Sequence, residues 1–289
     1  MADTPGTVSR ILWHFTGRPK WNAAENRQEN IPKPANEAYE AFLSILRSKQ
    51  LRIGQYREVV KVRVPKLQKY NREKRRVEEQ TNVLIELRSS PVCCLADIPI
   101  THLSYHAQRY GKFAIGFHRD AAVQHGFNPV FYTLYDTTVL KSLYDGFAQL
   151  RNVDVNAIEY AAEDVETEVQ GLECEHGHEV EVDLSSAVDN IQSEAQWVGN
   201  AVEAAQDSFE RFLAFVKTFD QDEFATIYCE REWRSVELFP FRFDHVAMVV
   251  LPRSDGKRSY FDKFISDGVR RLKFPRSIPV VPWEDLVEH

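Results

Sequence analysis

The segment "YCEREWRS", residues 228–235, decides the fold because it sets two glutamates one residue apart inside a strand-like run. Side chains alternate along a strand, so Glu230 and Glu232 are expected to point from the same face. Like charges in such positions weaken strand pairing unless a cation or a hydrogen-bonding ligand offsets them. Two interpretations follow. The segment is either a solvated edge strand whose charges discourage aggregation, or a strand that presents a carboxylate pair to a ligand.

The composition is that of a globular protein. The 289 residues are 43% hydrophobic and 12% aromatic, which is enough to build a large core. No apolar run is long enough to cross a bilayer, and the start "MADTPGTVSR" lacks the pattern of a signal peptide. We therefore expect a cytoplasmic protein with no membrane partner. The four cysteines are too few and too irregularly spaced for a disulfide framework.

Charge is distributed unevenly along the chain. Residues 57–76 carry nine Lys/Arg against two Glu, whereas residues 163–183 are strongly acidic. The basic stretch indicates an exposed hairpin or helix, which could attract nucleic acid even though the net charge of −7 opposes binding by the whole surface. The sequence "CEHGH" at residues 174–178 is more typical of a polar turn than of a zinc site, because no second ligand cluster accompanies it.

The apolar patterning predicts an α+β fold. "RILWHFTG" is typical of an aromatic-rich strand that ends at Gly17, and helical spacing follows over residues 37–51. Strands are expected in "VLIELRSSPVCCLADIPI", as two runs around a Ser-Ser-Pro turn, and in "KFAIGF", "NPVFYTLY" and "HVAMVVLP". Helices are expected in "HLSYHAQRY" and "TTVLKSLYDGFAQL", and over residues 186–219 and 259–271. Short strands interspersed with helices, without regular βαβ alternation, favour α+β over a doubly wound sheet.

The common catalytic signatures are absent from the sequence. There is no Walker phosphate loop, no GxGxxG, no nucleophile-elbow serine and no HExxH. His14 stands out because it lies inside an apolar strand, although a histidine in such a place is more often a structural core residue than a catalytic one.

Several segments together resemble the AbiGi abortive-infection family of bacterial phage-defence proteins. They are "LWHFTG", "SILRSKQLRIG", "PVCCLADIPITHLSYHAQRYGKFAIGFHRD", "NPVFYTLY" and "CEREWRS", in this order over most of the chain. The block at residues 92–117 is the most specific. The layout is in turn similar to that of ADP-ribosyltransferases, in which an early strand carries His-x-Thr and a late strand carries Glu-x-Glu.

This second similarity implies a fold and a substrate. The fold would be a split mixed or antiparallel sheet with flanking helices, in a single ADP-ribosyltransferase-like domain over residues 1–289. A basic insertion would occupy about residues 57–80 and an acidic, helical insertion about residues 150–219. The substrate would be NAD, whose nicotinamide–ribose bond breaks through a positively charged, oxocarbenium-like sugar that a carboxylate stabilises.

The same resemblance assigns roles to individual residues. Glu232 or Glu230 would hydrogen-bond the ribose as the catalytic carboxylate, whereas Arg231 would lie on the opposite strand face as a structural partner. The expected NAD-binding residues are His14 at the other ribose, with Phe15 and Thr16 beside it, Tyr105 or Tyr110 stacked on the nicotinamide, and Arg234 at the glutamates or a pyrophosphate.

Two function classes stay open at the level of sequence. In the first, the protein is an NAD-dependent ADP-ribosyltransferase that modifies a nucleic acid or a protein during phage infection, with the basic segment recruiting a nucleic-acid target. In the second, it is the antitoxin of a two-gene abortive-infection pair and binds a toxin without catalysis. Convergence of His14 and the glutamates on one cleft is required by the first class only.

Overall fold

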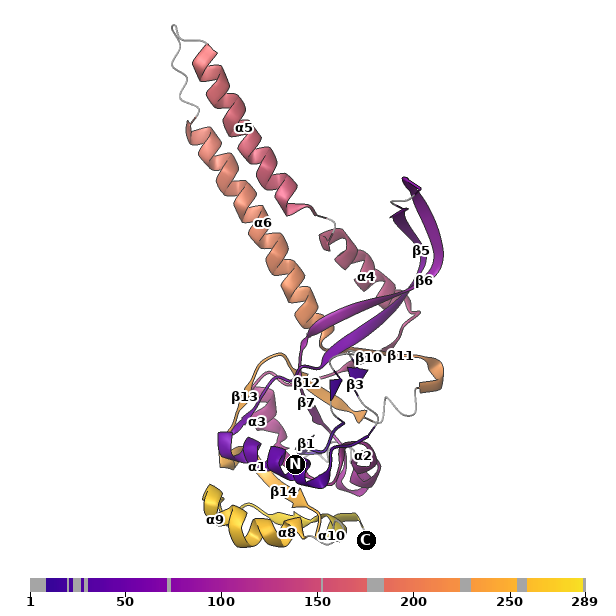
Figure 1. Ribbon diagram of the computed structural model, residues 1–289, viewed down its shortest axis with the longest axis vertical. Helices are drawn as coiled ribbons and strands as arrows, with labels where there is room; N and C mark the ends of the chain where they lie inside the picture. The colour runs from indigo at the N-terminus through magenta and orange to yellow at the C-terminus, as the bar shows by residue number, and fades with distance from the viewer. Residues whose placement is uncertain are drawn as a thin grey trace, which may run out of the picture. The chain divides into compact units, whose positions relative to one another are not determined.

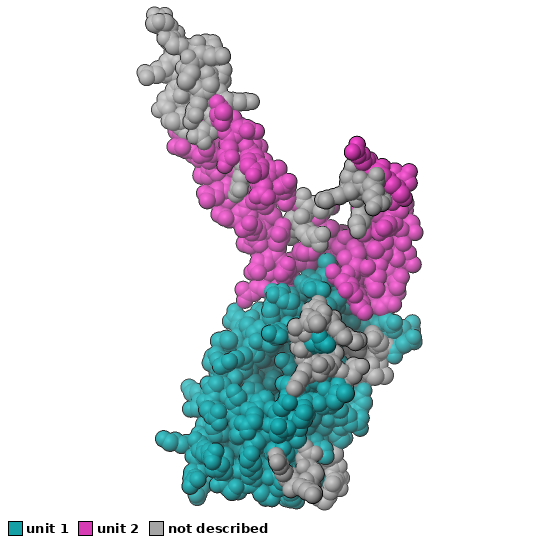
Figure 2. Space-filling view, viewed as in Figure 1, with its two compact units in different colours: residues 1–60, 87–134, 213–289 teal, residues 61–86, 135–212 magenta. Residues whose placement is uncertain are grey.

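The computed structural model describes residues 9–19, 21–22, 27–28, 31–71, 74–151, 153–175, 185–223, 230–253 and 259–287. The chain forms two compact units, which Figure 2 shows in teal and magenta. Unit 1 comprises residues 1–60, 87–134 and 213–289, and unit 2 comprises residues 61–86 and 135–212.

A seven-stranded mixed sheet forms the centre of unit 1. Neighbouring strands are antiparallel except for β14 and β15, which are parallel. The mixed sheet and the helices around it agree with the predicted α+β class (Figure 1). The strand order is β15 (Val280–Pro282), β14 (Val246–Leu251), β8 (Ala114–His118), β1 (Ile11–Phe15), β7 (Cys93–Ala96), β12 (Glu232–Ser235) and β9 (Asn128–Pro129).

Alternation along β1 divides the core of unit 1 between the two faces of the sheet. Leu12 belongs to one cluster together with residues of helix α1 (Ala35–Ser48). Trp13 and Phe15 belong to a second cluster with residues of α2 (Leu103–Tyr110) and α10 (Trp283–Val287). Both faces of the sheet are therefore covered, as expected for strands that are apolar at successive positions.

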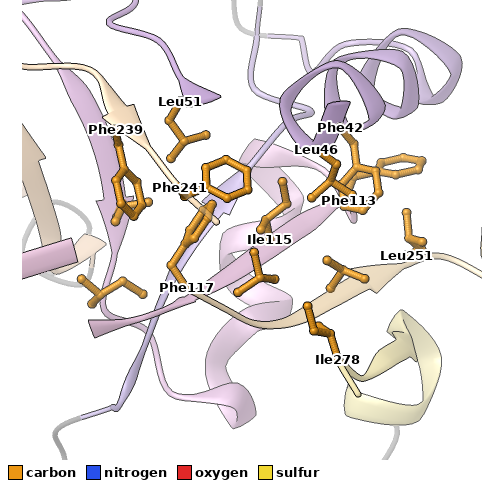
Figure 3. Packing of buried hydrophobic residues seen from close by; sticks show 14 of the residues in the cluster. Phe42, Leu46, Leu51, Phe113, Ile115, Phe117, Phe239, Phe241, Leu251 and Ile278 are labelled. Carbon is orange, nitrogen blue, oxygen red and sulfur yellow. The ribbon is translucent and has the colours of Figure 1, made fainter. Parts of the chain in front are cut away.

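Aromatic side chains fill the larger of the two clusters. Phe117 of β8 meets Phe239 and Phe241 edge-on, with ring centroids 5.1 and 5.0 Å apart, an arrangement that aromatic quadrupoles favour (Figure 3). Tyr39, Phe42 and Leu46 project from the buried face of α1 at helical spacing. The strands β4 (Gln50–Leu51) and β13 (Phe239–Pro240) pair with each other beside them.

Shorter elements complete the described part of unit 1. β10 (Phe131–Leu134) pairs in parallel with β11 (Val216–Phe219). The others are β2 (Trp21–Asn22), β3 (Arg27–Gln28), the 3₁₀ turns η1 (Ile100–His102), η2 (Gln221–Glu223) and η4 (Phe243–His245), α3 (Arg119–Gln124), α8 (Tyr260–Lys263), the π-helix η5 (Phe264–Gly268) and α9 (Val269–Leu272).

Unit 2 contains the long insertions of the chain. β5 (Arg57–Asn71) and β6 (Arg76–Pro91) pair as a two-stranded ribbon, so the basic segment is a hairpin, one of the two predicted alternatives. The helices are α4 (Thr138–Arg151), α5 (Val155–Glu175) and α6 (Ser185–Leu213). Phe147 of α4 stacks on Phe209 of α6 with a centroid distance of 4.4 Å. Among the described helices, none combines the length and the apolar character that a membrane span requires.

Two sequence-based boundaries are wrong. The helix predicted over residues 186–219 ends at Leu213, and Val216 and Phe219 lie in β11. Their side chains are buried in the strand, and an apolar stripe over so few residues fits either periodicity. The Ser-Ser-Pro sequence is part of β6 and makes no turn, because Pro91 is the last residue of the strand, where its missing N–H is tolerated.

A glycine contact holds the end of β1 against the end of α2. A Cβ atom added to Gly17 would lie 2.7 Å from the carbonyl oxygen of Tyr110 and 3.0 Å from the Cα of Gly111. Both contacts are to backbone, which has little freedom to move aside. Only glycine therefore allows β1 and α2 to approach this closely.

We expect Gly17→Ala to lower the melting temperature, because overpacking of this kind typically costs about 1–3 kcal/mol. Gly146→Ala is the matched control, since an added Cβ there meets nothing within 4 Å. It should leave the melting temperature unchanged or raise it, because alanine favours the helix. Equal melting of Gly17→Ala and the wild-type protein, followed by circular dichroism, would contradict the close approach.

Candidate functional site

A hollow in unit 1 opens beside the ends of β1, β7, β12 and α2. It encloses about 680 Å³, counting the part that is open to solvent. Aromatic and charged side chains share its lining. The lining residues are Trp13, His14, Phe15, Arg18, Tyr56, Cys94, Leu95, Ala96, His106, Arg109, Tyr110, Lys217, Glu230 and Glu232.

Glu232 points to this hollow because of strand register. Glu232 is paired with Ala96 of β7, and Ala96 with Trp13 of β1. Directly paired residues share a face of the sheet, so Glu232 lies on the face that packs against α2.

Glu230 lines the same hollow, but it does not lie in the strand as predicted. It precedes β12, and Arg231 between the two glutamates has a φ of 41°, in the left-handed region. The prediction of a regular strand through both glutamates, with Arg231 on its opposite face, is therefore wrong. Arg231 is nevertheless a structural partner, because its Nη2 lies 3.1 Å from Oδ2 of Asp97. The turn at Arg231 lets both carboxylates meet at one point.

That point is the ammonium group of Lys217. Its Nζ donates to Oε2 of Glu230 in a short contact and to Oε2 of Glu232 at 3.2 Å. The three side chains are 13%, 8% and 14% exposed, so water screens them little. Burial lowers the pKa of Lys217, but the two carboxylates outweigh it and hold the pKa well above its usual value. Lys217 is therefore a permanent cation.

A fully buried arginine provides the second cation for Glu232. Arg234 Nη2 donates to Oε2 of Glu232 at 2.7 Å and to Oε2 of Glu58, while Nη1 donates to the carbonyl of Ala214 at 2.8 Å. Burial raises the pKa of Glu232, but Arg234 and Lys217 together lower it well below its usual range. Glu232 is consequently ionised at neutral pH.

Two groups from α2 occupy the other oxygen of Glu230. Arg109 Nη1 lies 2.7 Å from Oε1, and the hydroxyl of Tyr110 donates to the same oxygen at 3.3 Å. Tyr110 stacks on His106 with centroids 4.5 Å apart. Burial raises the pKa of Tyr110, and the charge of Glu230 raises it further, so the phenol keeps the proton that it donates.

His14 lies at a split between β1 and β7. The two strands share a single register pair, Trp13 with Ala96. Beyond it, Nδ1 of His14 donates to the carbonyl oxygen of Cys94 at 3.1 Å, so a side chain links the strands where the backbone ladder has ended. Burial lowers the pKa of His14 to about 4, with a smaller contribution from the positive charges of Arg18 and Lys33. The imidazole is therefore neutral.

A second hollow adjoins the first at this split. It lies between β1, α1 and β4 and shares with the first hollow His14, Phe15, Arg18 and Cys94. Lys33 and Arg52 also line it. Within the described residues its charged lining groups are all cations, which suits an anionic ligand.

The structure brings some of the predicted site residues together and separates others. His14, Phe15, Tyr110, Glu230 and Glu232 line the first hollow. The others lie elsewhere. Thr16 donates its hydroxyl proton to the carbonyl of Ala38 and lines only the second hollow. Tyr105 is 53% exposed and lines neither hollow, and Arg234 is buried beneath Glu232.

Sequence reasoning missed several of the charged and aromatic residues in the hollow. Lys217 lies between apolar residues whose spacing predicts a helix, and Arg109 precedes Tyr110, which is the residue that the resemblance singles out.

No cluster of three metal-ligating side chains occurs in the part of the chain that the structure describes. His176 and His178 of "CEHGH" lie outside the described residues.

Comparison with known proteins gives one match. A family model described as a candidate abortive phage resistance protein AbiGi, antitoxin, matches residues 58–284, which is most of the chain. The chain belongs to the AbiGi family. The resemblance predicted from the sequence is therefore confirmed at this level. No curated protein and no solved structure matches the chain significantly.

The AbiGi match covers only part of the hollow. It includes Glu58, Lys217, Glu230 and Glu232, and so the whole network of carboxylates and cations. It begins after β1 and α1, so His14 lies outside it.

We expect Lys217→Met to lower the free energy of unfolding by about 3–5 kcal/mol at pH 7.5, because it leaves two buried carboxylates without their shared cation. The loss should shrink at about pH 3. The stability that the lowered pKa of Glu232 provides is present above the ordinary pKa of a glutamate and is lost as the pH falls below it. The variant keeps Arg234 beside Glu232 but not Lys217, so it has less of this stability to lose.

Urea unfolding followed by tryptophan fluorescence measures both effects. Lys112→Met, which removes an exposed lysine of unit 1, is the control and should unfold like the wild-type protein. Wild-type stability of Lys217→Met at both pH values would show that the network does not hold the site together.

Proposed function

We propose that this AbiGi protein is the antitoxin of a two-gene phage-defence pair and that it neutralises its toxin by binding. The observation that carries the proposal is the occupation of the two glutamates by the protein's own cations. Lys217 bridges both carboxylates, Arg109 and Tyr110 take the other oxygen of Glu230, and Arg234 contacts Glu232. The description of the AbiGi family as an antitoxin supports the same conclusion.

Electrostatics explains why this arrangement suits a binding protein. A carboxylate stabilises a developing positive charge only to the extent that other cations have not already neutralised it. Glu230 and Glu232 together contact three cationic side chains, Arg109, Lys217 and Arg234. The local charge is thus balanced or positive before any ligand enters. In such a site the carboxylates stabilise the folded protein and have little attraction left for a cationic sugar.

Growth of bacteria tests the antitoxin proposal. Expression of the chain alone should leave growth unchanged, and its co-expression with the other gene of the pair should restore growth that this gene alone arrests. Glu230→Gln and Glu232→Gln variants that still fold should protect as well as the wild-type chain. Arrest by the chain alone, or no protection against the other gene, would contradict the proposal.

A second function, NAD-dependent ADP-ribosyl transfer, is favoured by a separate observation. His14, Tyr110, Glu230 and Glu232, which are far apart in sequence, line one hollow. Arg18 lies where this hollow meets the second one and offers a cation to a pyrophosphate. In this proposal the ADP-ribosyltransferase-like layout is real, Tyr110 stacks on the nicotinamide, and Glu232 stabilises the ribosyl cation as nicotinamide leaves. The acceptor is a nucleic acid, a protein or water.

Incubation of the purified protein with NAD tests this second function. Release of free nicotinamide, detected chromatographically, is expected to fall by at least about 100-fold in Glu232→Gln, because charge stabilisation of the transition state is lost. Exposed Glu237→Gln, on the same strand-to-turn segment, should release nicotinamide at the wild-type rate. No release by the wild-type protein, with and without cell extract as a source of acceptor, would eliminate the transferase function.

A further inference from the structure

Helices α5 and α6 of unit 2 expose mostly negative charge, and they play no part in the site described in unit 1. Among the side chains that the structure describes, α5 exposes two carboxylates, Glu163 and Asp164, and α6 exposes five carboxylates and one arginine, namely Asp189, Glu194, Glu203, Asp207, Glu210 and Arg211. A surface of this sign repels nucleic acids and anionic lipids and attracts cationic proteins. Figure 1 draws both as long, regular helices.

α6 buries one narrow face, and α5 buries a small side chain. Ala162 of α5 and Val188 and Ala195 of α6 are between 5% and 9% exposed. Trp197 lies two positions beyond Ala195, on the opposite side of α6, and is 70% exposed. Burying a side chain of this size against a partner would remove a large apolar area from water.

Apart from Glu194, the residues that share the face of Trp197 are small and uncharged. They follow at helical spacing on either side, and all are exposed: Asn190, Ser193, Asn200, Ala201, Ala204 and Ser208. Glu194 and Asp207 flank this row, and both are exposed. An apolar anchor at the centre with charge at the edge is the usual arrangement of a protein–protein interface.

We propose that the Trp197 face of α6 is the docking surface for the toxin, and that the toxin presents there a positively charged surface with an apolar pocket for the indole. The inference rests on the proposed antitoxin function and adds the surface and the chemistry of the partner. Charge complementarity carries it, because the carboxylates of α5 and α6 steer a basic partner toward the helix while the small residues beside Trp197 allow its backbone to approach.

Binding between the purified chain and the purified product of the other gene of the pair tests the proposal. Trp197→Ala should raise the dissociation constant by at least about 30-fold, as truncation of a central aromatic anchor does. Ala201→Arg, which fills the same face with a bulky cation, should abolish binding. Tyr160→Ala is the matched control, because it removes a 65% exposed aromatic side chain from the outer face of α5 and should change nothing.

Two further measurements make the result independent of folding defects. Trp197→p-benzoylphenylalanine should cross-link to the toxin on irradiation, whereas the same replacement at Tyr160 should not. Raising the salt concentration from about 0.1 to 0.5 M should slow association, because screening acts on charge steering.

The outcomes separate this inference from the function on which it rests. Wild-type affinity of both Trp197→Ala and Ala201→Arg would overturn the docking surface and leave the antitoxin function standing. Failure of the wild-type chain to bind or neutralise the toxin would overturn the antitoxin function and, with it, this inference.

Discussion

The interaction on which the site depends is the sharing of one ammonium group by two carboxylates. Glu230 and Glu232 both contact Lys217, so their charges lie within about 6 Å of each other, where repulsion amounts to about 3 kcal/mol at an effective dielectric constant of 20. Without Lys217 the left-handed turn at Arg231, which brings the carboxylates together, would be opposed by that repulsion. With it, the end of β12, the strand β11 and, through Arg109, helix α2 converge on one ionised cluster. The shape of the hollow follows from this convergence.

The sheet contributes the second constraint. β1 and β7 part after one register pair, and the ring of His14 then joins them through the carbonyl of Cys94. The two hollows meet at this place, so a ligand that occupied both would pass from the glutamate cluster to the cations Arg18 and Lys33. The neutral state of His14 fits this position, because a charged imidazole would face the like charges of Arg18 and Lys33.

Sequence alone predicts local structure well here and long-range partners poorly. β1, α1 and α2 were found from aromatic spacing and helical periodicity, because these signals lie within one element. Convergence of His14 with the glutamates was expected only through resemblance. Arg234 was expected at the glutamates and does contact Glu232, but its contact with Glu58 across 176 residues was not expected, because nothing near either residue indicates the pairing. Lys217 was missed because Val216 and Phe219 fit a helical stripe as well as a strand. The positive φ of Arg231 also leaves no trace in a sequence that otherwise alternates like a strand.

A hollow lined by two glutamates is compatible with the proposed antitoxin function, because Lys217 and Arg234 occupy the positions beside the carboxylates that a cationic ligand would take. In an NAD-cleaving site a developing ribosyl cation would lie against the carboxylates during the reaction; here Lys217 and Arg234 lie against them permanently. Ion pairs of this kind hold the folded protein together, and this is the role that the proposed antitoxin function gives to the cluster. In the proposed antitoxin, binding of the partner then depends on another part of the chain, and α5 and α6, with their mostly negative charge and exposed tryptophan, have the properties that such a task requires.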